Sequence, residues 1–71
     1  MNKRFWLIQK RMEAGYTQKA FAAELGMHVN QYNAYENGRV SPQVDQQLRI
    51  ANALGFDVKL WYENEKINRR Q

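Results

Sequence analysis

Apolar residues recur at three- and four-residue spacing along the first 55 residues, which is the period of amphipathic helices. Glycines at 15, 26, 38 and 55 divide this stretch into four segments and stand where helices commonly end. The pattern predicts four short helices, over residues 2–14, 17–25, 29–36 and 41–54. Thr17 is the expected N-cap of the second helix, and Ser41 followed by Pro42 is the expected start of the fourth.

Each predicted helix has apolar positions that we expect to face a common core. They are Phe5, Ile8 and Met12 in the first, Phe21, Ala22 and Leu25 in the second, Tyr32 and Tyr35 in the third, and Val44, Leu48, Ala51 and Leu54 in the fourth. Trp6 and Phe5 are expected in the core or in a dimer contact.

The last apolar segment alternates with polar residues at a period of two, which favours a half-buried strand over residues 56–63. A short fifth helix capped by Asp57 is the alternative. A lone strand leaves its edge unpaired, so its favoured partner is the same segment of a second subunit. The predicted dimerisation residues are then Phe56, Val58, Leu60 and Tyr62. Residues 64–71 are predicted to form a flexible basic tail.

Composition narrows the function classes. A chain of 71 residues holds one small domain, and with no cysteine and a single histidine it predicts no disulfide, no metal site and no cofactor. No serine–histidine–acid set or phosphate-binding glycine loop is present, so we expect no catalytic residue and no enzyme. No apolar run approaches the ~18 residues of a membrane span and no secretory signal is evident, so we expect a cytoplasmic protein without a membrane partner.

The charge balance points to a polyanionic partner. Eleven Lys and Arg residues against seven Asp and Glu give a net charge of +4. Nucleic acid is the commonest polyanion that attracts a small basic domain.

Residues 17–38 carry the candidate chemistry. Their pattern predicts a helix, a glycine turn and a second helix, with Gly26 at the bend and the small Ala22 where the two helices cross. Such a unit can hold its second helix in the major groove of DNA. The exposed face of that helix would present the amides of Asn30, Gln31 and Asn33, and an amide can pair with the N6/N7 edge of adenine. An ordinary solvated helix face is the alternative.

The motif T-Q-x-x-F-A-x-x-x-G over residues 17–26, followed by Y-x-x-Y-E-N-G over residues 32–38 and the Ser-Pro helix, resembles the Cro and phage-repressor (XRE-like) helix-turn-helix family. The resemblance covers about residues 4 to 55 and implies a mainly α, compact four-helix repressor-like domain over residues 1–55. It implies base-edge contacts from Val29, Asn30, Asn33 and Ala34, phosphate contacts from Gln18, His28, Gln31, Asn37 and Arg39, and a structural salt bridge between Arg11 and Glu36. It also implies that Gln18 braces the recognition helix.

Three features depart from the family pattern. His28 stands where the family usually has Ser or Thr, so the N-cap of the recognition helix is weakened or chemically different. Val29 and Ala34 stand where polar base readers are frequent, which suggests contacts with thymine methyl groups. The alternation at the C-terminus is similar to the subset of the family whose last segment is a dimerising strand.

The function that these features predict is sequence-specific binding of double-stranded DNA by a transcriptional regulator. We expect a repressor that binds a palindromic operator as a homodimer. The alternative is an antitoxin that binds and neutralises a toxin protein and autoregulates its operon.

Overall fold

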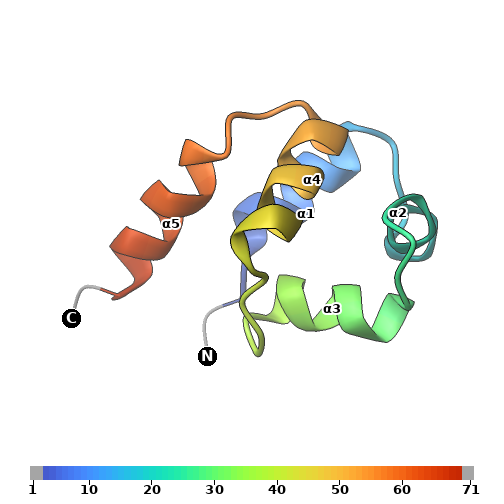
Figure 1. Cartoon of the computed structure of the whole chain (residues 1–71), viewed down its shortest axis with the longest axis horizontal. Helices are drawn as coiled ribbons and strands as arrows, with labels where there is room; N and C mark the ends of the chain where they lie inside the picture. The colour runs from blue at the N-terminus through green and yellow to red at the C-terminus, as the bar shows by residue number, and fades with distance from the viewer. Residues whose placement is uncertain (1–2, 70–71) are drawn as a thin grey trace.

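Five helices and no strand make up residues 3–69, the part of the backbone that the computed structural model describes; side chains are described for residues 3–65. The helices are α1 (Phe5–Glu13), α2 (Gln18–Glu24), α3 (Val29–Asn37), α4 (Val44–Leu54) and α5 (Lys59–Arg69). Helix α3 runs along one edge of the body, and α5 stands at the end farthest from α2 (Figure 1). The predicted mainly α, repressor-like fold is confirmed. No helix within the described range has the length and apolar character needed to cross a membrane.

The preferred prediction of a strand over residues 56–63 is wrong, and the alternative fifth helix is what the structure contains. The Asp57 carboxylate accepts the backbone N–H of Lys59 at 2.9 Å, where α5 begins. Period-two alternation would have placed Trp61 on the polar side, whereas the helix buries this side chain to 1% exposure. Helix α5 also continues through residues 64–69, part of the predicted tail, and residues 70–71 lie outside the described range.

The helix boundaries near the glycines follow the sequence closely. Thr17 caps α2, because its hydroxyl accepts the backbone N–H of Ala20 at 3.0 Å. Gly26 has a φ of 71° at the bend between α2 and α3, and Gly38 ends α3 with a φ of 79°. These left-handed conformations strain residues that carry a Cβ atom, which explains glycine at both turns.

The predicted start of α4 at Ser41-Pro42 is wrong. The helix begins at Val44, with Gln43 in extended conformation as its N-cap. The Ser41 hydroxyl instead accepts a hydrogen bond from Arg4 at 2.9 Å, and the Pro42 carbonyl accepts one from Gln47 at 3.0 Å. Both residues therefore belong to the linker that joins α3 to α4.

The core lies where α1, α2, α3, α4 and α5 converge. Its buried members are Leu7, Phe21, Ala22, Leu25, Tyr32, Ile50 and Trp61. The predicted buried face of α2 is confirmed. In α4 the predicted Ala51 is buried at 2% exposure and Leu54 packs partly buried against the core, whereas Val44 and Leu48 remain 67% and 43% exposed. The pattern did not select Ile50, which is fully buried.

The predicted buried face of α1 is also wrong. Phe5 and Met12 are 69% and 63% exposed, while Arg4, Leu7 and Arg11 face inward. The true inner face lies one residue earlier along the sequence, which corresponds to a rotation of about 100° around the helix axis. Two of its three members are arginines, so a search for apolar periodicity selects the wrong face.

Arg4 holds α5 against the rest of the molecule. The Arg4 side chain is 3% exposed, and its guanidinium donates to both carboxylate oxygens of Glu65 at 3.0 Å. It also donates to the carbonyls of Tyr35 and Val40 and lies 5.6 Å from the ring of Trp61. A charge removed from water needs such partners, and here they come from the end of α3, the following linker and α5.

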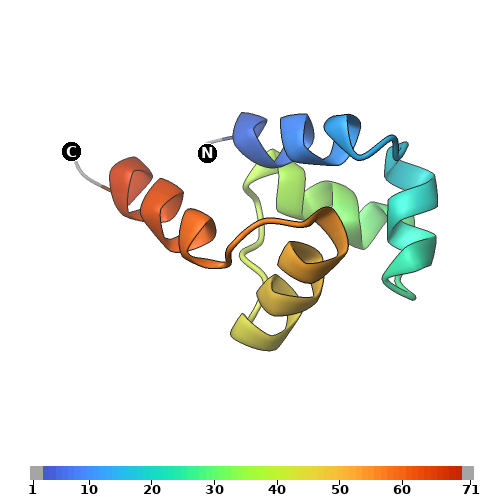
Figure 2. The same cartoon turned by 90° about the horizontal axis from the view of Figure 1, so that it is seen from above.

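Aromatic packing completes the contact between α1 and α5. The rings of Trp6 and Trp61 meet edge to face with centroids 5.1 Å apart, and Phe56 meets Trp6 in the same manner at 5.6 Å. The indole N–H groups of both tryptophans are buried and have no hydrogen-bond acceptor among the described residues. This cluster is therefore held by apolar contact. In the view from above, α5 approaches the body beside α1, with α4 on the other side of the connecting segment (Figure 2).

Replacing Glu65 with Gln should lower the free energy of unfolding by about 1–2 kcal/mol, because the hydrogen bonds to Arg4 remain possible but the opposite charge is lost. Urea unfolding followed by circular dichroism would measure the change. Glu63→Gln is the matched control, since Glu63 is exposed on the same helix and should change stability by less than about 0.5 kcal/mol. Equal effects of the two substitutions would contradict the role assigned to the Arg4–Glu65 pair.

Candidate nucleic-acid interface

A buried carboxylate, Glu36, joins the three helices that build the interface. It lies near the end of α3 and is 0% exposed. Arg11 of α1 donates to it through Nε at 2.6 Å, and Tyr32 donates its hydroxyl at 2.6 Å. Gln18 of α2 donates through Nε2 at 2.7 Å to the other carboxylate oxygen. The Arg11–Glu36 ion pair that the family resemblance implies is therefore present.

The same contacts fix the protonation of the donors. Burial, and then the hydrogen bond to Glu36, raise the pKa of the Tyr32 hydroxyl above its ordinary value. The hydrogen bond to Glu36 is also the main cause that raises the pKa of Arg11. The hydroxyl of Tyr32 therefore stays a donor and the guanidinium of Arg11 stays charged over the ordinary pH range.

A chain of amides leads from this carboxylate to the outer face of α3. The Gln18 side-chain oxygen accepts from Asn33 Nδ2 at 3.1 Å. The Asn33 oxygen in turn accepts from Asn37 Nδ2 at 2.7 Å, one helical turn further along α3. Asn33 and Asn37 are half-buried as a result. Three of the predicted contact residues thus form one hydrogen-bonded row across α2 and α3. We call it the amide row, and its members are Gln18, Asn33 and Asn37.

His28 performs the capping that Ser or Thr would perform at the start of α3. Its Nδ1 accepts the backbone N–H of Asn30 at 3.2 Å. In return, the Gln31 side-chain oxygen accepts the backbone N–H of His28 at 3.3 Å. These reciprocal bonds satisfy N–H groups that a helix start leaves unpaired, so the departure at His28 preserves the cap with different chemistry.

The remaining predicted contact residues differ in exposure. Asn30, Gln31 and Arg39 are exposed, whereas Val29 is half-buried against the core. Ala34 is only 8% exposed. It forms part of a shallow hollow of about 340 Å³ on α3, together with Asn30, Gln31, Tyr35 and Val40. Amide groups and apolar surface are therefore adjacent on this helix.

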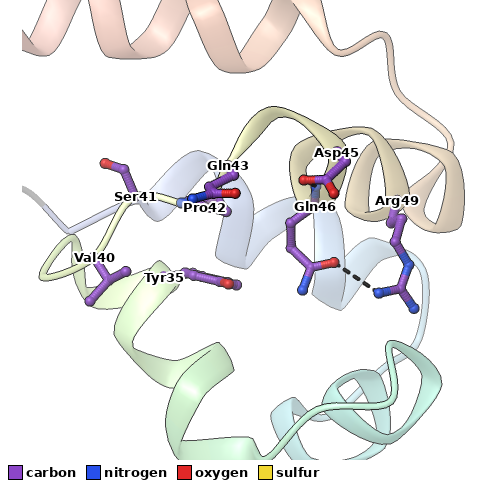
Figure 3. A pocket seen from close by; sticks show the side chains of 8 residues that line it. All are labelled: Tyr35, Val40, Ser41, Pro42, Gln43, Asp45, Gln46 and Arg49. Atoms are coloured by element: carbon purple, nitrogen blue, oxygen red, sulfur yellow. Dashed lines mark hydrogen bonds between the residues drawn. The ribbon is translucent and has the colours of Figure 1, made fainter.

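A second hollow, of about 440 Å³, opens between α3 and the start of α4 (Figure 3). It shares Tyr35 and Val40 with the first. Arg49 lines the end of this hollow opposite Val40 (Figure 3). It donates to the Gln46 side chain at 3.0 Å and to the carbonyl of Leu25 at 2.8 Å. Gln46 and Arg49 are not among the predicted contact residues. An arginine one turn after a glutamine on α4 is the only signal in the sequence, and it is a common one.

Comparison with known proteins agrees with this geometry. Residues 7–61 match the family model described as helix-turn-helix. A protein of Bacillus subtilis strain 168, described as the uncharacterized HTH-type transcriptional regulator YqaF, is 38% identical over 63 residues, which span 86% of this chain and 80% of the relative. The comparison with solved structures gave no significant match. The chain belongs to the helix-turn-helix family of Cro and phage-repressor type, whose members are DNA-binding transcriptional regulators. Helices α2 and α3 are its helix-turn-helix unit.

Replacing Tyr32 with Phe should lower the free energy of unfolding at neutral pH by about 1–2 kcal/mol, because Glu36 loses a donor. The deficit should shrink at high pH. The pKa of Tyr32 is higher in the folded protein than in the unfolded chain, so its contribution is complete below about pH 10 and is lost as the pH rises, by up to about 1.4 kcal/mol per unit. Urea titrations of both proteins between pH 8 and 11 would measure this, and a constant difference would contradict it.

Replacing His28 with Ala should cost about 1 kcal/mol of stability, because Asn30 loses the acceptor for its N–H. His28→Ser should restore most of that loss, since a serine hydroxyl caps the same position. Thermal unfolding of the three proteins would rank them. Equal stability of the Ala and Ser variants would show that the cap contributes nothing.

Proposed function

We propose that this protein is a sequence-specific repressor that binds a palindromic operator in double-stranded DNA as a homodimer. The observation that carries the proposal is the pair of amides on α3, one exposed at Asn30 and one held in place at Asn33, within the helix-turn-helix unit of the family. The B. subtilis relative is described as a transcriptional regulator, which supports the same class of function. Occupying a promoter would prevent transcription from it.

Base recognition would come from α3. The major groove is about 12 Å wide and admits a helix, and an amide can bond an adenine through its N6 and N7 atoms. Asn30 is free of the amide row and exposed, so it is our first base-reading residue. The hollow beside it has Ala34 and Val40 in its lining, which suits the methyl group of a thymine.

Affinity would come mainly from contacts with phosphates, since these release counterions. Arg39 is exposed directly after Gly38, which ends α3, and Lys19 is exposed beside Gln18 at the start of α2. Gln18 and Asn37 each use one N–H within the amide row. A carboxamide has a second N–H, so both residues retain a donor for a phosphate oxygen.

A palindromic operator requires two copies related by a two-fold axis. Residues 56–63 form no strand, so the second copy cannot add to this segment by strand pairing. Val44 and Leu48 are exposed apolar residues four positions apart, so they share one stripe of α4. We propose this stripe as part of the dimer contact.

Selection of bound duplexes from a random pool at physiological salt tests the proposal. We expect enrichment of two inverted half-sites with centres about 34 Å apart, the distance of one helical turn. A pool that shows no enrichment would contradict sequence-specific binding, and a single half-site would contradict the dimer.

On the selected duplex, Asn30→Ala should weaken binding by about 1–3 kcal/mol and relax the preference at one base position. Binding to random DNA should stay nearly unchanged. Asn52→Ala is the matched control, since Asn52 is an exposed asparagine on α4. Equal losses on selected and random DNA would remove Asn30 from the base-reading residues.

A further inference from the structure

We infer that the buried carboxylate of Glu36 sets, through Gln18, the direction in which the Asn33 amide faces DNA, which makes Gln18 and Glu36 positioning residues for base recognition. The inference deepens the proposed function and rests on it. It concerns which end of an amide is presented to a base, and it follows from the order of donors and acceptors along the row.

The direction of the row starts at Glu36. As the ion-pair partner of Arg11, this carboxylate can only accept hydrogen bonds. Gln18 must therefore turn its NH₂ group toward Glu36, as the 2.7 Å contact shows. Its oxygen then faces α3 and is available only as an acceptor.

The orientation of each later amide in the row follows from that of the amide before it. Asn33 must donate through Nδ2 to the oxygen of Gln18, at 3.1 Å, so its own oxygen is directed elsewhere. That oxygen accepts from Asn37 Nδ2 at 2.7 Å. A reversed Asn33 amide would oppose NH₂ to NH₂ at Asn37 and oxygen to oxygen at Gln18, so one orientation is strongly preferred.

The orientation decides what Asn33 can read. Its two bonds within the row use one N–H and one oxygen lone pair, and an amide has a second of each. Adenine presents one acceptor, N7, beside one donor, N6, so it needs one N–H and one lone pair in a fixed order. An amide held in that order before binding avoids the loss of rotational freedom on binding and rejects a base with the reversed order.

The inference predicts that Gln18 affects discrimination as well as affinity. Gln18→Ala, and Gln18→Met, which keeps the side chain long, should reduce the preference for the cognate base pair at the position read by Asn33. The discrimination ratio should fall ~5-fold to ~150-fold, the range for losing one bidentate pair. The double variant Gln18→Ala/Asn33→Ala should discriminate at that position no less than Asn33→Ala alone.

The experiment measures dissociation constants on the selected duplex and on duplexes with single base-pair changes. Gln9→Ala is the control, because Gln9 is an exposed glutamine on α1 outside the row, and it should leave every ratio unchanged. Gln18 variants that bind all duplexes uniformly more weakly, with ratios intact, would overturn the inference and leave the proposed function standing. A wild-type protein without any preferred duplex would overturn both.

A second measurement needs no DNA. Side-chain amide hydrogen exchange, followed by NMR, should be slower at Asn33 than at the exposed Gln9 in the wild type, and Gln18→Met should remove that difference. Exchange at Asn33 as fast as at Gln9 in the wild type would show that the row does not hold the amide and would overturn the inference.

Discussion

The structure depends on one charged carboxylate, that of Glu36, which is buried and bonded by protein donors in place of water. Glu36 is fully buried and receives hydrogen bonds from α1, α2 and its own helix. Losing any one donor would leave part of a buried charge uncompensated, which is among the costlier defects in a small protein. The three helices are thereby fixed in position with a precision that the small apolar core alone would not impose.

The second ion pair, which is partly buried, has a different effect, because it joins parts that are far apart in the sequence. Arg4 and Glu65 are 61 positions apart, and Arg4 also bonds the carbonyls of Tyr35 and Val40. The beginning of the chain, the end of the recognition helix and the last helix meet at this guanidinium. Stability of α5 and order in the linker after α3 are therefore linked, although none of the described α5 side chains, residues 59–65, belongs to the proposed DNA-binding face.

The sequence predicted the elements of the helix-turn-helix unit well because the local signals there agree with one another. Thr17, Gly26 and Gly38 are each required by a cap or a left-handed backbone, and these requirements depend on neighbouring residues only. Likewise, Phe21 and Ala22 lie on an apolar face of α2 that is truly buried. The contacts with DNA bases and phosphates remain predictions.

Prediction failed where distant residues decide the outcome. The buried position of Arg4 is not predicted, because its partner Glu65 is near the other end of the chain. The repeat Arg4, Leu7, Arg11 does have helical spacing, but two charged members conceal it from a search for apolar stripes. At Trp61 the apolar pattern was present but indicated the wrong element. The alternation over residues 56–63 favoured a strand, yet the segment from residue 59 is a helix that buries the large ring of Trp61.

The position of the two tryptophans has a practical consequence. They are the only tryptophans in the chain, and both lie in the cluster that joins α1 to α5. The recognition helix contains tyrosines and no tryptophan. Intrinsic indole emission thus gives a label-free optical reporter for release of the last helix, separate from events at the DNA-facing edge of the molecule.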